Sequence, residues 1–340
     1  MNQEQLHRLF QAEFELCRMR LEESVVVVAG PRSNPAYVEA SLTAAQALGA
    51  RVFQVVLPEG GGALPGRPLA HLPLVVETLK RADMVIDHHF ILHSPEQVEI
   101  LQAGARMLLI LEPPEILSRL FPTPRQRRRV EQGAELLRQA KELRLASEAG
   151  TDFRAAITQY PVITQYGYTD QPGRWDHWPS TFLYTWPNEG DAEGTVVLDT
   201  GDLVWPLRRY LAHPVSLRIE KGYLRAIEGG PDAELLDAYL RSWNDPEGYA
   251  VSHLGWGLDE RAVWNALNLE PTTRGMDSRS FLGNFQFSTG PNTDAGGSRH
   301  TPCHLDMPMR RCSLWLDGCQ VLDAGRLVID EAQPSRRDAS

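Results

Sequence analysis

A short run of β-branched residues near the N-terminus restricts the fold more than any other part of the sequence. Residues 24–30 read Ser-Val-Val-Val-Val-Ala-Gly, with four consecutive valines and no charged side chain. A strand that is apolar on both faces is typical of a parallel sheet that helices cover on each side. We therefore expect a buried strand here, in a domain of the α/β class.

Helical and strand patterns alternate over the first part of the chain. The spacing of apolar residues predicts helices over 3–22, 35–48 and 72–81, and strands over 51–57, 83–87 and 106–111. This alternation is typical of a doubly wound α/β domain. We place that domain at residues 1–150 and expect the charged pattern over 126–148 to form its last helix.

The pattern changes after residue 150, where short β-type runs dominate. Strands are expected over 194–199, 215–219, 222–227, 280–287, 313–317 and 320–323, with one helix near 232–243. Residues 151–330 are therefore expected to form a mixed α+β domain that carries the metal site. The polar tail at residues 331–340 is expected to be disordered.

Composition narrows the classes of partner and the cellular location. The chain has 340 residues and a formal net charge of −10, which argues against binding to nucleic acid or an anionic membrane. No apolar run approaches the ~20 residues of a membrane span, and the N-terminus lacks the apolar core of a signal peptide. None of the four cysteines forms a Cys-x-x-Cys pair, so we expect reduced thiols and a cytoplasmic protein.

A His-x-Asp motif near the C-terminus is the strongest candidate for metal binding. His304 and Asp306 lie two residues apart, so their side chains point to the same side of an extended segment. His253, in a Ser-His-Leu-Gly-Trp-Gly segment, is the second histidine candidate, and His300 is a looser competitor. Two imidazoles and one carboxylate leave coordination positions open, which suits Fe(II) that binds a substrate together with O₂. A structural imidazole with one hydrogen bond remains the alternative for His253.

Three histidines follow the predicted strand over 83–87. In a doubly wound sheet, ligands bind beyond the carboxyl ends of the strands, where His88, His89 and His93 are expected. Histidine has a pKa near the working pH and therefore suits proton transfer. The alternative is that all three only line the start of a helix.

Other side chains are candidates for substrate contact. His177 lies between Trp175 and Trp178, whose rings could form the wall of a site for an aromatic substrate or could be ordinary loop packing. Ser288 could orient a substrate oxygen or cap a turn. Arg279 could pair with a phenolate, or it could form a structural salt bridge.

Four motifs together resemble a known enzyme family. They are Gly150-Thr-Asp-Phe153, Glu193-Gly-Thr-Val196, Ser252-His-Leu-Gly-Trp-Gly257 and Thr301-Pro-Cys-His-Leu-Asp-Met307. Their combination resembles the metalloaminopeptidases of the aminopeptidase T group. It is more similar to an offshoot of that group, the 2,5-dihydroxypyridine 5,6-dioxygenases of bacterial nicotinate and nicotine degradation. The likeness spans most of the chain.

Departures from the peptidase pattern separate the two groups. The peptidases bind two metal ions through two glutamates, two histidines and an aspartate. Here their Pro-Thr-Glu-Glu segment falls on Pro179-Ser-Thr-Phe182, a further glutamate falls on His253, and the first histidine falls near Gln286. Only His304 and Asp306 match unchanged. Fewer carboxylates mean less charge to hold two divalent ions together, so the comparison implies a site for one ion.

The resemblance to the dioxygenases implies an activity and a set of residues. It implies extradiol-type ring cleavage of 2,5-dihydroxypyridine by O₂ to N-formylmaleamate, with one Fe(II) per chain and a homo-oligomeric protein. It assigns the metal to His253, His304 and Asp306, acid–base chemistry to His93, and substrate contact to His177 and Ser288. A metallo-aminopeptidase and a non-catalytic binding protein of the same fold remain the two alternatives.

Overall fold

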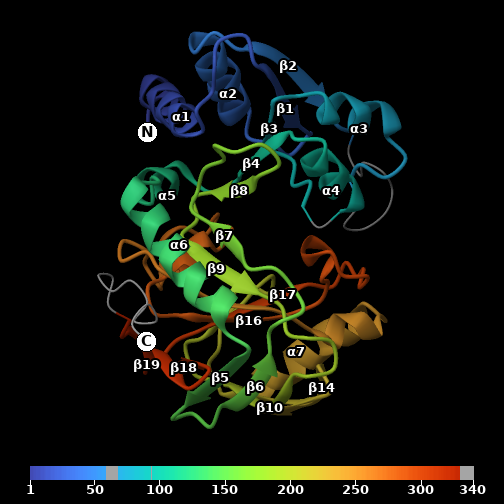
Figure 1. Ribbon diagram of the computed structural model, residues 1–340, viewed down its shortest axis with the longest axis vertical. Coiled ribbons are helices and arrows are strands. Elements are labelled where there is room, and N and C mark those ends of the chain that lie inside the picture. The colour runs from blue at the N-terminus through green and yellow to red at the C-terminus, as the bar shows by residue number, and fades with distance from the viewer. Residues whose placement is uncertain (59–67, 93, 330–340) are drawn as a thin grey trace, which may run out of the picture. The chain divides into compact units, whose positions relative to one another are not determined.

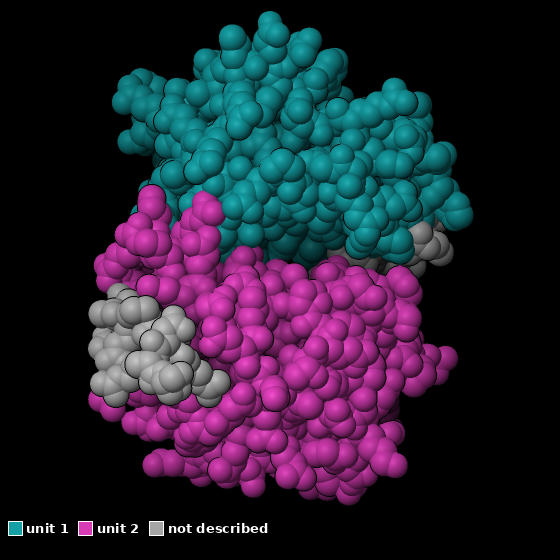
Figure 2. All heavy atoms as spheres, viewed as in Figure 1, with its two compact units in different colours: residues 1–123, 165–181, 264–277 teal, residues 124–164, 182–263, 278–340 magenta. Residues whose placement is uncertain are grey.

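The computed structural model describes residues 1–58, 68–92 and 94–329 and divides into two compact units. Unit 1 comprises residues 1–123, 165–181 and 264–277, and unit 2 comprises the remaining segments (Figure 2). Each unit therefore contains segments that are distant in sequence. The division differs from the expected boundary at residue 150, because residues 124–150 belong to unit 2 and two later segments belong to unit 1. None of the described helices is long and apolar enough to cross a membrane.

A five-stranded parallel sheet forms the centre of unit 1 (Figure 1). Its strand order is β2 (Arg51–Val56), β1 (Ser24–Ala29), β3 (Met84–Asp87), β4 (Arg106–Ile110) and β8 (Trp175–Trp178). In the register, Val26 of β1 lies opposite Phe53 of β2 and Val85 of β3. The valine run therefore forms a buried strand of a parallel sheet, and the prediction of an α/β fold is confirmed.

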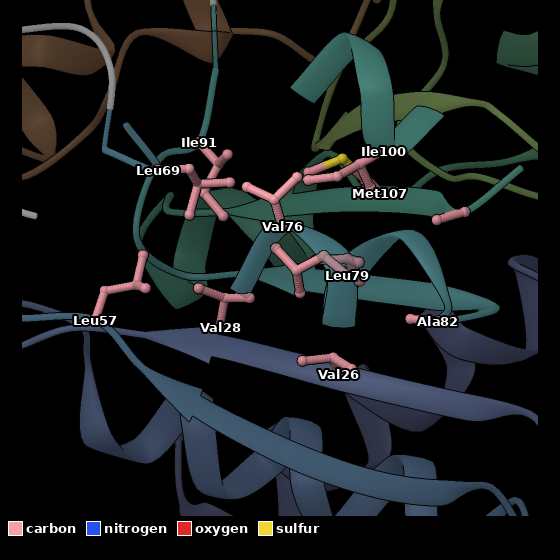
Figure 3. Packing of buried hydrophobic residues seen from close by; sticks show 12 residues of the cluster. Val26, Val28, Leu57, Leu69, Val76, Leu79, Ala82, Ile91, Ile100 and Met107 are labelled. Atoms are coloured by element: carbon pink, nitrogen blue, oxygen red, sulfur yellow. The ribbon is translucent and has the colours of Figure 1, made fainter. Parts of the chain in front are cut away.

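Unit 1 contains six helices that the structure describes, and some of them supply apolar residues that cover this sheet. They are α1 (Gln3–Leu16), α2 (Pro35–Ala47), α3 (Pro73–Lys80), α4 (Pro95–Gln102), α5 (Pro114–Arg119) and α8 (Ala266–Leu269). Val76 and Leu79 of α3 and Ile100 of α4 pack with Val26 and Val28 of β1 in one buried cluster (Figure 3). Val25 and Val27 are buried as well, so burial on both faces of β1 accounts for its run of apolar residues.

Unit 2 contains two sheets and a short two-stranded ribbon, β11 (Leu203–Val204) with β12 (Arg209–Tyr210). The larger sheet has the order β14 (Tyr223–Gly229), β13 (Val215–Glu220), β10 (Glu193–Leu198), β6 (Asp152–Ala156), β5 (Glu142–Ser147), β18 (Cys312–Leu316), β19 (Cys319–Asp323) and β20 (Arg326–Leu327). Helix α7 (Pro231–Ser242) contacts β13 and β14 of this sheet, whereas α6 (Pro124–Gln139) contacts the second sheet. These elements confirm the predicted mixture of helices and antiparallel strands.

The second sheet of unit 2 carries the candidate site. Its order is β17 (Leu305–Met309), β16 (Phe285–Thr289), β15 (Val251–Gly257), β9 (Phe182–Thr185) and β7 (Ile163–Gln165). The short elements η1 (Pro246–Tyr249), α9 (Met276–Ser280) and η2 (Thr293–Ala295) precede β15, β16 and β17, respectively. Phe153 of β6 contacts Phe287 of β16 edge to face, with ring centroids 5.7 Å apart, so the two sheets share a core.

Three predicted elements end or begin at other residues than expected. Helix α1 ends at Leu16 instead of residue 22, and Arg18 has a positive φ of 53°, which a helix does not allow. The helix expected over 126–148 ends at Gln139, and β5 follows it, with Leu143 and Leu145 buried between exposed neighbours. The strand expected from residue 280 begins at Phe285, because a turn at Gly283 with φ of 85° separates it from α9.

Candidate metal centre

Three side chains of unit 2 converge at the edge of the smaller sheet. His253, His304 and Asp306 each offer a ligand atom, and these atoms all lie within 4.8 Å of one another. The Nε2 atoms of His253 and His304 lie 2.9 Å and 3.2 Å from the same carboxylate oxygen, Oδ1 of Asp306. Among the described residues, this is the one group of histidine, cysteine and acidic side chains with such spacing.

The strand pattern explains how these residues come together. Asp306 lies in β17, opposite Ser288 of β16, and His304 immediately precedes β17. His253 lies in β15, on the other side of β16, where the register shifts between Val251 and Leu254. Such an irregularity changes the direction of side chains in a strand. Residues about 50 positions apart in sequence thus meet across two adjacent antiparallel strand pairs, β15 with β16 and β16 with β17.

The orientation of His304 is fixed by a backbone contact. Its Nδ1 atom lies 3.0 Å from the carbonyl oxygen of Thr289, which can only accept a hydrogen bond. This contact uses the proton on Nδ1 and leaves Nε2, which faces Asp306, as the nitrogen that can bind a metal ion. Gly290 makes this approach possible. A Cβ atom there would lie 2.5 Å from the Cys303 oxygen, and its φ of 123° also favours glycine.

The two carboxylate oxygens of Asp306 have different partners. Oδ1 faces the two imidazoles, whereas Oδ2 accepts a hydrogen bond from Nε of Arg279 at 2.8 Å. Burial alone would raise the pKa of Asp306, but the positive charge of Arg279 and the interactions with His304 and His253 hold it well below its usual value. The carboxylate is therefore ionised, with one oxygen directed toward both imidazoles.

This donor set fits a divalent transition metal. It combines two imidazole nitrogens with one ionised carboxylate oxygen, and such sets with open positions are typical of non-haem Fe(II) oxygenases. Arg279 occupies the second oxygen, so the carboxylate presents a single oxygen to the shared space. Both of the sequence alternatives for Arg279 were open, and the structure shows the salt bridge. A contact between Arg279 and substrate stays a prediction.

Aromatic side chains next to His253 were missed by the sequence analysis. The rings of Tyr184 and Trp186 lie 4.8 Å and 6.0 Å from the imidazole of His253, and both residues are buried. Trp186 Nε1 donates to the Pro291 oxygen at 3.2 Å, which fixes its ring. A signal was present, because an aromatic residue recurs at every second position from Phe182 to Trp186. That alternation places the aromatic rings on one face of β9.

Ser288 contacts the backbone of a candidate ligand. Its hydroxyl donates to the carbonyl oxygen of His253 at 2.8 Å, and the side chain is fully buried. The hydroxyl thus links β16 to β15 next to the irregular register. A hydroxyl that donates once can still accept a hydrogen bond, so a role in substrate contact stays a prediction.

His177 lies in unit 1, in strand β8, where it pairs with Leu109 of β4. The residue is buried, and its backbone N–H donates to Oδ1 of Asp176 at 2.9 Å. Its neighbour Trp178 is fully buried, with its ring 5.1 Å from that of Phe10. Of the two alternatives for Trp178, these contacts support packing in the core of unit 1. Substrate contact by His177 stays a prediction.

The three histidines after β3 have different surroundings. His88 is buried, with Nε2 2.8 Å from Ser41 Oγ and Nδ1 3.1 Å from the Ile110 oxygen, and burial lowers its pKa to about 4. His88 is therefore a neutral structural residue at neutral pH. His89 is half-buried against Gly30, and burial lowers its pKa as well. His93, the predicted acid–base residue, lies outside the described residues.

Comparison with known proteins agrees with this geometry. The profile of the family described as 2,5-dihydroxypyridine 5,6-dioxygenase matches residues 5–329. The chain belongs to this family. A curated 2,5-dihydroxypyridine 5,6-dioxygenase from Pseudomonas putida is 47% identical over 349 residues, which cover 98% of each chain. The family resemblance seen in the sequence motifs is thus confirmed.

Solved structures place the dioxygenase family within a wider fold. The structure of 2,5-dihydroxypyridine dioxygenase from P. putida KT2440 matches with a TM-score of 0.93 and 45% identity, covering 98% of this chain and all of that one. AmpT from Thermus thermophilus matches with a TM-score of 0.60 and 14% identity, over 95% of this chain and 99% of that one. The second likeness concerns the fold alone, and it agrees with the aminopeptidase T-type architecture expected from the sequence.

Proposed function

We propose that this protein cleaves the ring of 2,5-dihydroxypyridine with O₂ to give N-formylmaleamate, using one Fe(II) held by His253, His304 and Asp306. The observation that carries the proposal is the convergence of two imidazole Nε2 atoms on one oxygen of an ionised carboxylate. Membership of the dioxygenase family supports the substrate and the reaction. Both atoms of O₂ enter the product, so the reaction needs no external reductant.

Bound Fe(II) would supply open coordination positions for a substrate oxygen and for O₂. Its redox chemistry would allow electrons to pass from the substrate to O₂. The protein residues prepare this site. The hydrogen bond from His304 Nδ1 to Thr289 holds the lone pair of Nε2 toward Asp306. Arg279 keeps Asp306 ionised and restricts it to one donor oxygen. Preorganised ligands of this kind lose little freedom when an ion binds.

Substrate orientation is assigned to His177, Ser288 and Arg279. The hydroxyl of Ser288 donates to His253, so toward substrate it would act as an acceptor for a ring N–H or O–H group. The guanidinium of Arg279 has five N–H donors in a planar fork, so it can pair with Asp306 and with an ionised ring oxygen. His177 would donate or accept at the ring edge. These roles rest on the family resemblance and on residue chemistry.

His93 is proposed to move a proton between the substrate hydroxyl and oxygen during ring opening. The proposal rests on the resemblance and on the reference pKa of histidine, about 6.5. The surroundings of His88 support the choice indirectly, because both of its ring nitrogens already have structural partners.

Metal analysis combined with oxygen uptake tests the proposed function. Purified protein loaded anaerobically with Fe(II) should bind one ion per chain and consume one O₂ for each 2,5-dihydroxypyridine. Zn²⁺ should also bind, because Zn²⁺ generally binds nitrogen and oxygen donors more tightly than Fe²⁺, but it should support no turnover since it cannot change redox state. Two ions per chain together with peptide hydrolysis would instead identify an aminopeptidase. Metal binding without turnover on a panel of dihydroxypyridines and dihydroxybenzenes would identify a binding protein.

We also propose that the protein is cytoplasmic and homo-oligomeric. The cysteine pattern supports the location, and the family resemblance supports the assembly. Cell fractionation and analytical ultracentrifugation test the two statements separately.

A further inference from the structure

Trp205, directly after β11, makes two kinds of contact around the candidate site of unit 2. Its backbone exchanges both hydrogen bonds with Asp306, from Trp205 N to Asp306 O at 2.8 Å and from Asp306 N to Trp205 O at 3.1 Å. Its indole contacts the segment that carries Arg279. The Nε1 atom donates to Ser278 Oγ at 3.1 Å, and the centre of the Arg279 guanidinium lies 5.6 Å from the ring centroid.

These contacts connect the two partners of the Arg279–Asp306 ion pair through one residue. A reciprocal pair of backbone hydrogen bonds fixes the separation of two strands within a few tenths of an ångström. The backbone of Trp205 therefore has a fixed position relative to Asp306, and the hydrogen bond from Nε1 to Ser278 holds the indole. A guanidinium near an aromatic face is attracted by the ring quadrupole, most strongly for tryptophan. Burial of Trp205, which is 5% exposed, strengthens this attraction because water does not screen it.

A second cation lies near the same ring. The guanidinium centre of Arg208 is 5.2 Å from the ring centroid of Trp205. The backbone of Arg279 is also held, since Nε2 of Gln286 donates to the Arg279 carbonyl oxygen at 2.6 Å. Arg279 is thus held in place by Gln286, which binds its carbonyl oxygen, and by Asp306 and the indole, which contact its side chain.

We propose that Trp205 is a positioning residue for the metal centre, which sets the direction of the Asp306 carboxylate by holding Arg279 against it. The proposal rests on the proposed function, because it assumes that Asp306 is a metal ligand. The side chain of Trp205 contacts Ser278 and Arg279, on the segment that carries the partner of Asp306. Its effect on the metal is therefore exerted through Arg279.

Substitution of the Trp205 side chain tests the role of the indole while it leaves the backbone hydrogen bonds between Trp205 and Asp306 in place. Trp205→Met keeps the backbone hydrogen bonds to Asp306 and fills much of the space, but it removes the ring face and the Nε1 donor. Trp205→Phe retains a smaller ring face and loses the Nε1 donor. Trp178→Met is the matched control, because Trp178 is a fully buried indole in the core of unit 1. Circular dichroism and thermal melting of the metal-free proteins identify any general loss of folding.

The readout is Co²⁺ binding to the metal-free protein, followed by the visible absorption of the bound ion. Loss of an outer-sphere partner of a ligand usually costs 10–100-fold in metal affinity. We expect Trp205→Met to weaken Co²⁺ binding by about 10-fold or more and to change the absorption bands, which report ligand geometry. Trp205→Phe should restore most of the affinity, and Trp178→Met should keep the wild-type affinity and spectrum.

A double-mutant cycle with Arg279→Lys decides whether Trp205 acts through Arg279. If it does, Trp205→Met should weaken Co²⁺ binding much less in the Arg279→Lys background than in the wild type. Should Trp205→Met fail to fold, the cycle is run with Trp205→Phe. Additive effects in the cycle, or a wild-type Co²⁺ affinity and spectrum for Trp205→Met, would overturn the proposal. Failure of the wild-type protein to bind Co²⁺ or Fe(II) would overturn the metal site itself, and the positioning role with it.

Discussion

Arg279 and Asp306 form an ion pair in which Nε of the arginine lies 2.8 Å from Oδ2 of the aspartate, while Oδ1 faces two histidines. One carboxylate oxygen of Asp306 thus binds Arg279, and the other is available to the proposed metal. An arginine suits this task because its planar fork restricts the carboxylate in direction as well as in charge. Two predictions follow from this division, one for Arg279 and one for the ligands.

For Arg279, substitution should weaken the metal site more than a surface ion pair would suggest. Arg279→Gln removes the charge that keeps the Asp306 pKa low and leaves its second oxygen with a weaker partner. We expect metal affinity to fall by about 10–100-fold, the usual cost of losing a partner behind a ligand. Titration of the metal-free protein with Fe(II) or Co²⁺ measures this. If metal affinity is unchanged and only KM for 2,5-dihydroxypyridine rises, Arg279 serves substrate binding alone.

Removal of any one ligand should abolish iron binding and turnover. His253→Ala and His304→Ala each leave two protein donors. Asp306→Asn replaces the charged donor oxygen by a neutral amide and avoids an empty space beside Arg279. The fold should persist, because most of the core of unit 2 lies elsewhere. Iron content and O₂ uptake are the measurements, and His300→Ala is the control, since His300 is exposed and outside the group of three. Full iron occupancy in one of the variants would exclude that residue as a ligand.

The stability of the fold should depend on the ionisation of His88. Its pKa is about 4 in the folded protein against 6.5 for an ordinary histidine, because burial disfavours the charged ring. The unfolded chain therefore binds a proton at a higher pH than the folded one. The contribution is complete above pH 6.5 and is lost as the pH falls toward 4, by on the order of 3 kcal/mol. Urea unfolding at a series of pH values measures it.

His88→Gln is the matching variant, because glutamine can hydrogen-bond without taking up a proton in this range. The variant should be less stable than the wild type at pH 7 and should lose less stability between pH 6.5 and 4. Equal pH dependence in the two proteins would show that other groups cause the loss.

His93 should affect turnover without affecting the metal. His93→Ala is expected to bind Fe(II) normally and to lose about 10²–10⁴-fold in kcat, the usual contribution of one positioned acid–base group. The pH–rate profile should also lose the limb near the histidine reference pKa of about 6.5. His89→Ala is the control from the same segment. If it reproduces the loss and His93→Ala does not, His89 carries the proton.

Parts of this molecule were predictable because their sequence signal is local. The valine run at 24–30 allowed only a strand buried on both faces, and His304 with Asp306 needed only an extended backbone to point the same way. Strand β5 was missed although Leu143 and Leu145 alternate with polar residues, because a strongly helical charged segment precedes it without a proline or glycine between them.

Other parts depend on contacts between segments that are distant in sequence. Nothing near Arg279 indicates Asp306 as its partner, and nothing near Trp205 indicates that its backbone pairs with β17. The aromatic neighbours of His253 come from β9 and the residue directly after it, about 70 residues earlier. They were overlooked in favour of tryptophans that pack in unit 1. Side chains of ordinary composition acquire such roles only through strand pairing, which single-sequence patterns do not encode.

The candidate ligands lie on or beside paired strands of one sheet, with β16 between β15 and β17. Hydrogen-bonded strands hold their spacing whether or not an ion is present, in contrast to small zinc domains that unfold when the metal is removed. The metal should therefore bind to a site that is already folded. The rate of binding would be set by access of the ion to the site and by loss of the ion's hydration water. The folded protein would then form before the metal binds. A sample from which a chelator has removed the metal would take it up again without unfolding.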